Sequence, residues 1–252
     1  MSEMTVDTKN GIIIGVDCFP ANFRESSIIL KHIERIKTGT NISIDKLGLD
    51  AGYDAGAVHR GLELLGVTGY VSCIDFSYDI LKREATYFPE SDCFECPAGK
   101  RIDFVKLAYK KSSQNYYRLY RMSTSDRKNC RTCERFRECE LSHSAARICA
   151  SAYYPAFYRN RQRYGTSEYK AMKRLRSIWA EGAFAVLKRE HNLARAQKRG
   201  LHRVAEERLF SALALNLKRM VKALGSAETS FGLGIAGRRS WVYLNRAGLI
   251  SA

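Results

Sequence analysis

Two carboxylates of this chain stand where they could hold metal ions for phosphoryl transfer. Asp50 ends residues 46–50, which read as a short strand, and Glu181 lies in a long helical pattern. Hard carboxylate oxygens on a strand end and on a facing helix can hold two Mg²⁺ or Mn²⁺ ions close together. The carboxylates alone leave an ordinary reading open, because Asp is frequent at strand ends and Glu is frequent on helices.

Five of the eight cysteines are clustered, in the order Cys93-x2-Cys96 and then Cys130-x2-Cys133-x5-Cys139. Two CxxC pairs separated by a loop indicate zinc, because each pair can bind one Zn²⁺ through a tight turn. Five cysteines are available for four positions, and four thiolates leave no place for water, so the zinc is expected to be structural. Buried free thiols are the simpler reading for the scattered cysteines, Cys18, Cys73 and Cys149.

The charge of the chain indicates a polyanionic partner. Lys and Arg number 42 against 26 Asp and Glu, which gives a formal charge of +16. Nucleic acid is the commonest partner of such a surface. No run of eighteen apolar residues and no signal-like start occurs, so a cytoplasmic protein without a membrane partner is predicted.

Two basic stretches are candidate DNA contacts. Residues 106–121 (KLAYKKSSQNYYRLYR) interleave cations with tyrosines, which fits either phosphate binding and stacking or a solvated hairpin with cross-strand Tyr pairs. Phosphate contact is better supported where cations directly follow the helix that carries Glu181, because DNA must pass the reacting site. These cations are Lys188, Arg189, Arg195, Lys198, Arg199 and Arg203.

The first 75 residues alternate between strand and helix patterns. Strands are predicted at 3–7 and 11–19 around an Asn-Gly turn, then at 46–50 and 67–74. Helices are predicted at 26–37 and 57–65. This is an α/β pattern with a parallel part to its sheet, and right-handed crossovers place Asp50 at the carboxyl edge, where such folds build sites.

The rest of the chain divides by composition. Residues 76–149 read as a cysteine-rich, basic insertion, and residues 150–224 as a helical part with runs at 168–192 and 202–224. Residues 225–252 form a tail, in which residues 241–244 could dock as a short strand. A stripe in the second run is predicted to face the core, namely Leu209, Leu213, Leu217 and Val221.

Three segments resemble motifs of DDE insertion-sequence transposases. The stretch GLDAGY around Asp50 resembles their second-Asp motif, and RLRSIWAEGAFAVLK, which contains Glu181 and Lys188, resembles their Glu helix. The segment VDCFPAN at residues 16–22 resembles the strand that precedes their first helix. The order and spacing of the three make the resemblance specific over nearly the whole chain, although Tyr169, Arg174 and Arg176 stand in a looser register than the family's Tyr and Arg.

The resemblance implies a ribonuclease H-like mixed sheet with flanking helices, interrupted by a small zinc-binding insertion. It implies metal-dependent cleavage and transfer of DNA strands, with Asp50 and Glu181 as catalytic Mg²⁺ or Mn²⁺ ligands and Lys188 on phosphate. It also implies transposon ends and target DNA as partners, a homo-oligomer in the DNA complex, and a place at the nucleoid. The family's cysteine pattern favours a zinc set without Cys93: Cys96, Cys130, Cys133 and Cys139.

One departure from the family stands at the front of the chain. The family core begins with three antiparallel strands, the first of which carries the first catalytic Asp, whereas only two are predicted here. By this comparison the missing strand lies upstream of Met1, on another or longer polypeptide, and Asp7 and Asp17 are poor substitutes. The alternatives are a non-catalytic, zinc-stabilised DNA-binding remnant and a nuclease on the same fold.

Overall fold

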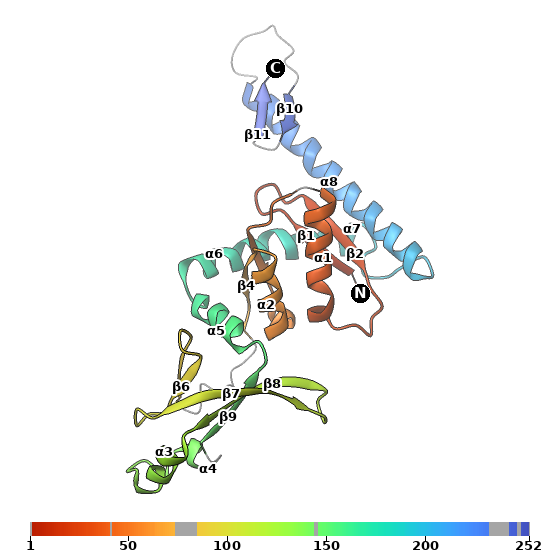
Figure 1. Cartoon of the computed structure of the whole chain (residues 1–252). Coiled ribbons are helices and arrows are strands. Elements are labelled where there is room, and N and C mark those ends of the chain that lie inside the picture. Colours follow the sequence, from red (N-terminus) through yellow and green to blue (C-terminus); the bar gives the residue numbers. More distant parts are fainter. Residues whose placement is uncertain are drawn as a thin grey trace.

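The computed structural model describes residues 2–40, 42–73, 85–143, 146–231, 242–245 and 248–251. Figure 1 shows a mixed α/β arrangement in two parts. One part contains the first four strands with helices packed around them, and the other is a five-stranded sheet joined to it by helix α5.

The chain begins with an antiparallel hairpin, as its sequence predicts. Strands β1 (Ser2–Val6) and β2 (Ile13–Cys18) pair from Ser2 opposite Cys18, with an irregularity between Thr5 and Val6. Gly11 closes the turn with a φ of 72°, a conformation that side chains disfavour. A Cβ at Gly11 would also collide with the ring of Trp179, so this glycine allows both the turn and a close helix approach.

Two strand–helix units follow the hairpin. They comprise helix α1 (Glu25–Thr40), strand β3 (Lys46–Leu49), helix α2 (Gly56–Leu64) and strand β4 (Thr68–Val71). Strands β3 and β4 pair in parallel, which confirms the parallel part of the sheet. The two helices and the strands share one apolar core, whose fully buried members include Ile33, Val58, Leu62 and Val71.

The four strands do not form one sheet. The pair β1–β2 and the pair β3–β4 are separate two-stranded sheets, and no further strand in the described ranges pairs with either. One edge of β1 and one edge of β3 therefore keep backbone groups that no strand in these ranges satisfies.

The predicted insertion folds as an antiparallel sheet of its own. Its strands follow chain order: β5 (Thr86–Phe88), β6 (Cys93–Glu95), β7 (Arg101–Lys110), β8 (Asn115–Met122) and β9 (Arg147–Ser151). Short helices α3 (Thr124–Asn129) and α4 (Glu140–His143) lie between β8 and β9. The predicted boundary at residue 149 thus falls inside β9, because the strand pairing with β8 continues to Ser151.

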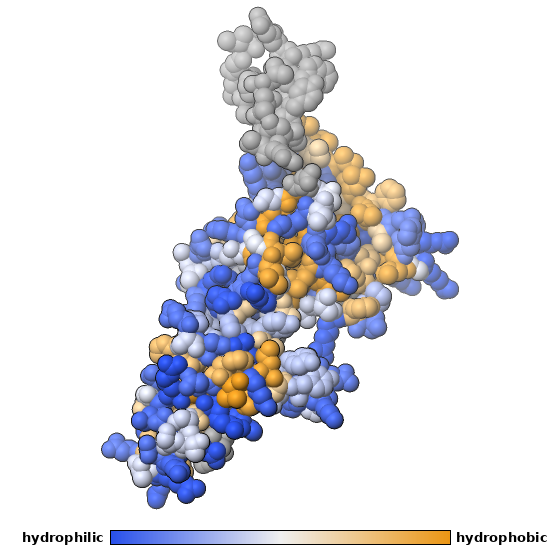
Figure 2. Space-filling view, in the orientation of Figure 1, coloured by the Kyte–Doolittle hydropathy of each residue, from blue (hydrophilic) through white to orange (hydrophobic). Residues whose placement is uncertain are grey.

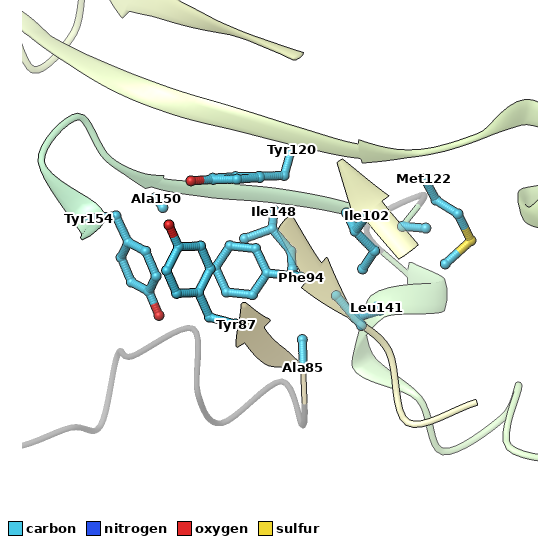
Figure 3. Close-up of a cluster of buried hydrophobic side chains, with 11 residues drawn as sticks. Ala85, Tyr87, Phe94, Ile102, Tyr120, Met122, Leu141, Ile148, Ala150 and Tyr154 are labelled. Atoms are coloured by element: carbon cyan, nitrogen blue, oxygen red, sulfur yellow. The ribbon is translucent and has the colours of Figure 1, made fainter. Parts of the chain in front are cut away.

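Aromatic side chains build the core of this sheet (Figure 3). Phe94 lies between Tyr87 and Tyr120, with ring centroids 4.9 Å and 4.8 Å away. Tyr154, from the start of helix α5, packs on Tyr87 at 5.0 Å in an edge-to-face contact. Such pairs add about 0.5–1.5 kcal/mol each to the burial of their area. The core therefore reaches beyond the strands and fastens the sheet to α5.

The helical part consists of α5 (Tyr154–Arg163), α6 (Ser167–Arg176), a π-helical turn (Ser177–Glu181), α7 (Gly182–Glu190) and α8 (Leu201–Phe231). The run predicted at 168–192 is thus one helical path with a π-helical turn in its middle. Such turns occur often at functional sites. In the tail, β10 (Val242–Asn245) and β11 (Gly248–Ser251) pair as an antiparallel hairpin.

Helix α8 packs on β2 through one face. The Asn216 side chain accepts a hydrogen bond from Ile13 N (2.8 Å) and donates one to Ile13 O (2.9 Å). Ala212, Leu215 and the charged Arg208 are buried on the same face. No helix in the described part of the chain, α8 included, is long and apolar enough to cross a membrane.

The core stripe predicted on α8 is wrong. Leu209, Leu213, Leu217 and Val221 are 52–69% exposed. Helical spacing identifies an apolar face but not what covers it, and the face that meets β2 here is the one with Asn216 and the small Ala212.

Candidate functional site

A groove separates the free edge of β1 from the free edge of β3. It has a volume of about 1090 Å³ and is lined by every residue of both strands. The path from α6 through the π-helical turn to α7 forms a further wall, with these side chains: Met172, Leu175, Arg176, Trp179, Ala180, Phe184 and Lys188. The groove thus has two backbone edges and a largely apolar wall.

Asp50 lies at the carboxyl end of β3, where this groove ends. Its Oδ1 accepts a hydrogen bond from Gly52 N (2.9 Å) and so caps the 3₁₀ turn at residues 51–53. The predicted location of Asp50 at a strand end is confirmed. The cap fixes one oxygen of the carboxylate and orients the group, as a metal ligand requires.

Further carboxylates surround Asp50. Glu3, at the start of β1, accepts a hydrogen bond from the Tyr53 hydroxyl (2.5 Å). Burial raises the pKa of Glu3, the hydrogen bond from Tyr53 opposes this, and Glu25 and Asp50 raise the pKa further by repulsion. The pKa of Tyr53 is raised, first by burial and then by its bond to Glu3. Three carboxyl groups are therefore crowded at this end of the groove, and a bound cation would relieve the repulsion between their charged forms.

The start of β1 and the end of β3 thus meet at the same end of the groove, so the two strands run in opposite directions across it. Gly52 contributes to the crowding there, because a Cβ at this position would collide with the Glu25 carboxylate. The sequence interpretation missed Glu3 and Glu25, since neither lies in a recognisable motif.

Glu181 closes the π-helical turn on the groove wall. Its carboxylate accepts hydrogen bonds from Arg176 Nη2 (2.6 Å) and the Ser177 hydroxyl (3.0 Å). Lys188 lines the groove, whereas Glu181 is not among the residues that line it. The ion pair turns the carboxylate back along its own helix, a contact that the sequence interpretation did not assign.

Asp50 and Glu181 therefore lie on opposing elements without converging on one point. No group of three or more His, Cys, Asp or Glu side chains in the described ranges is arranged to hold a metal ion. The other two acidic candidates are engaged elsewhere. Asp7 caps Asn10 N (2.8 Å), and Asp17 binds His32 Nδ1 (2.6 Å) and Arg35 (2.9 Å).

Four cysteines line a smaller pocket in the other part of the molecule. This pocket has a volume of about 240 Å³ and contains the set that the family pattern favours, Cys96, Cys130, Cys133 and Cys139. Burial raises the pKa of the Cys130 thiol, and the nearby charges of the other three raise it further. The backbone closes tightly after Cys96 and within the Cys130-x2-Cys133 pair, with Gly99 N to Cys96 O at 2.9 Å and Cys133 N to Cys130 O at 3.1 Å.

Cys93 is separate from this set. It is 3% exposed on β6, and its thiol contacts the Ser91 hydroxyl at 3.1 Å. The prediction of buried free thiols is wrong for Cys149, which is exposed, while Cys18 and Cys73 are half-buried. The alternating exposure of β9 explains Cys149, because its neighbours Ile148 and Ala150 face the core.

The predicted DNA-binding cations lie on α7, in the loop to α8 and, for Arg203, in the first turn of α8, and all are exposed. Arg189 pairs with Glu190 (2.8 Å) and Lys198 with Glu206 (3.9 Å). In the described ranges no ion pair engages Lys188, Arg195 or Arg199. The Glu207 carboxylate accepts bonds from the backbone of residues 197 and 198 (3.0 and 3.2 Å) and so anchors the loop to α8.

The basic, aromatic stretch at 106–121 forms most of the β7–β8 hairpin. Tyr109 and Tyr116 pair across the strands, with ring centroids 5.1 Å apart and both rings at least half exposed. No acidic residue occurs between Asp103 and Asp126. The cross-strand pair and the exposed cations coexist, so both earlier readings of this stretch remain compatible with the structure.

Comparison with known families identifies the chain. The family model described as a transposase DDE domain matches residues 79–221, which is more than half of the 252 residues. The chain belongs to this family of transposases, whose members are DNA phosphoryl-transfer enzymes that use divalent metal ions. The match includes Glu181, Lys188 and the four pocket cysteines, whereas Asp50 precedes it. No curated protein and no solved structure matches the chain.

Proposed function

We propose that this chain contributes the second Asp and the Glu of a transposase site that cleaves DNA strands and transfers their ends. The observation that carries the proposal is the groove, which has Asp50 at its end and the helical path with Glu181 and Lys188 along its wall. A ribonuclease H-like arrangement accounts for this placement, and the mixed α/β fold is compatible with it.

The residues present fit a divalent cation in their chemistry. Asp50 and Glu181 would supply oxygen ligands for Mg²⁺ or Mn²⁺, and the crowding of Glu3, Glu25 and Asp50 favours positive charge. Bound there, such a cation would activate the attacking oxygen and stabilise the leaving oxygen. Glu181 has to leave Arg176 before it can serve as a ligand, and Arg176 is then available to a DNA phosphate.

We further propose that an extended segment completes the groove. Such a strand would run antiparallel to β1 and parallel to β3, satisfying both free edges. Its carboxyl end would lie beside Asp50, where an acidic residue would complete the set of ligands. An upstream-encoded transposase segment is the proposed source, and a strand about five residues long matches β1 and β3.

The completing strand can be tested with a synthetic peptide of about five strand-forming residues that ends in Asp. We expect the added peptide to slow hydrogen exchange of the β1 and β3 amides and to shift the emission of Trp179, which lines the groove. The same peptide with a central proline is the control, since proline cannot donate to a ladder. Equal exchange rates with and without the unmodified peptide would refute strand addition.

DNA binding through the loop between α7 and α8 gives a second prediction. If Arg195 and Arg199 each contact a phosphate, their joint replacement by Ala lowers the slope of log K against log salt by roughly 2 and weakens binding about tenfold. The measurement is fluorescence anisotropy of labelled duplex DNA over a salt series. The matched control is Lys31→Ala with Arg60→Ala, two cations on helices α1 and α2. An unchanged slope would exclude this loop from the interface.

One observation favours a second candidate function. The ion pair of Glu181 with Arg176 satisfies the carboxylate without metal, as expected of a DNA-binding remnant that no longer catalyses. A remnant binds DNA but shows no metal-dependent cleavage, even with the completing segment. A nuclease on the same fold would instead cleave without regard to the transposon-end sequence.

We also propose a structural zinc ion in the cysteine pocket. The donor set is chemically suitable, because four thiols share one small pocket, and the thiols would have to draw closer together to coordinate one ion. The Lys100 N–H points at Cys96 Sγ (3.4 Å), a contact that would orient and stabilise a thiolate. The ion would tie the α3–α4 segment to the turn after β6.

A further inference from the structure

The outer face of helix α8 carries a continuous row of exposed apolar side chains. Figure 2 shows it as a hydrophobic band along the helix. Each member is between 40% and 69% exposed. The row, called the outer stripe, consists of Leu209, Phe210, Leu213, Leu217, Met220, Val221 and Leu224.

The outer stripe is not the face that holds α8 to the body. The buried residues Arg208, Ala212 and Leu215 mark the side that meets β2. At 100° per residue, the centre of the stripe lies roughly 160° around the helix from them. Packing of α8 on β2 therefore cannot cover the stripe. A large continuous apolar patch that stays exposed on one chain usually has a function.

The stripe contains a heptad pattern. Five of its members are separated alternately by three and four residues: Phe210, Leu213, Leu217, Met220 and Leu224. This is the spacing with which one helix packs along another in a coiled-coil seam. None of the seven positions is charged, so this face does not suit the phosphate backbone of DNA.

We propose that the outer stripe binds the outer stripe of a second copy of this chain. A heptad seam on one helix is complementary to itself, so a two-fold pair of α8 helices buries both stripes at once. Its seven side chains are 40–69% exposed and offer roughly 650 Å² per copy, so a pair that covered all of them would bury at most about 1,300 Å², near the lower end of the range of stable protein–protein interfaces.

Two features of the fold favour pairing at this face. A seam of two heptads is short for isolated helices, but α8 is already ordered by its packing on β2, so little ordering entropy is lost on association. Helix α8 also runs along the outside of the α/β part and projects beyond it, which leaves the stripe accessible to another molecule (Figure 1). The pairing requires neither metal nor DNA, so its test does not depend on the proposed catalytic activity.

Sedimentation velocity of the full chain without DNA, from micromolar to tens of micromolar, tests the pairing. We expect wild-type protein to sediment as two chains and the double variant Leu213→Glu with Leu217→Glu as one, with a dissociation constant at least about 100-fold larger. The control is Leu64→Glu, which places the same charge at a leucine that is 71% exposed on α2 and should leave the pair intact. Circular dichroism and thermal melting establish that each variant is folded.

Hydrogen exchange of residues 209–224 provides a measurement without a substitution. We expect slower exchange in this segment as the protein concentration rises. A wild-type chain that sediments as a single copy at all concentrations overturns the proposal. A double variant that still dimerises with wild-type affinity also overturns it, because the dimer then uses another surface.

Discussion

Asp50→Asn lowers metal-dependent DNA cleavage by about 1,000-fold, provided that the completing segment is present. The amide keeps the size of the side chain but loses the negative charge that would hold a divalent cation, and it still accepts the hydrogen bond from Gly52 N. DNA affinity should change by less than about twofold, because the phosphate contacts lie on other residues. The measurement is the rate of strand cleavage on labelled duplexes that carry the ends of the element, in Mg²⁺.

The matched control for this prediction is Asp45→Asn. Asp45 lines the same groove at the opposite end of β3, where its carboxylate accepts a bond from Ser43 (2.6 Å). We expect near wild-type cleavage from it. A change of metal distinguishes a metal ligand from a residue that only supports the fold. Asp50→Cys should recover part of its cleavage activity in Mn²⁺ but not in Mg²⁺, since thiolates bind softer ions. Cleavage by Asp50→Asn at the wild-type rate would remove Asp50 from the site.

Cys130→Ser is expected to abolish zinc binding and to unfold the α3–α4 segment. Structural zinc contributes about 10–16 kcal/mol in isolated finger peptides, and a loss of even about 4 kcal/mol would exceed what the small core of this segment can offset. Zinc content by mass spectrometry should fall from one ion per chain to near zero. A chelator should have the same effect on wild-type protein, seen as loss of protection from proteolysis between residues 123 and 143.

Two further serine substitutions decide which cysteines bind the ion. Cys149→Ser is the matched control on the exposed face of β9 and should retain full zinc content. Cys93→Ser should also retain it, because the Cys93 thiol is buried beside Ser91 and away from the pocket. If Cys93→Ser lost its zinc and Cys96→Ser retained it, Cys93 rather than Cys96 would be the fourth zinc ligand.

The order of strands and helices in the first 75 residues could be predicted from the sequence, because it depends on local signals. The Asn-Gly turn, the periodicity of α1 and the apolar runs of β3 and β4 each act over a few neighbouring residues. The spacing of the cysteines predicted a cluster of five candidates for four positions, and the family resemblance favoured the four that line the pocket. The same local signals placed Asp50 at a strand end.

What the helices face was not predictable in the same way. The apolar spacing of α8 is genuine, yet β2 packs on the face that offers Asn216 and small side chains, so Leu213 and Leu217 remain outside. The π-helical turn before Glu181 and the capture of its carboxylate by Arg176 depend on how α6 and α7 are packed.

The sequence by itself determined the family, the basic character, the clustering of five cysteines and the strand-end position of Asp50, because each depends on residue type and short-range spacing. Only the tertiary structure decided that β1 and β3 present free edges to one groove, that Glu3 and Glu25 join Asp50 there, and that α8 carries its stripe outward. These features arise between segments far apart in the chain. They are set by which surfaces exclude water from each other, and no local pattern encodes that choice.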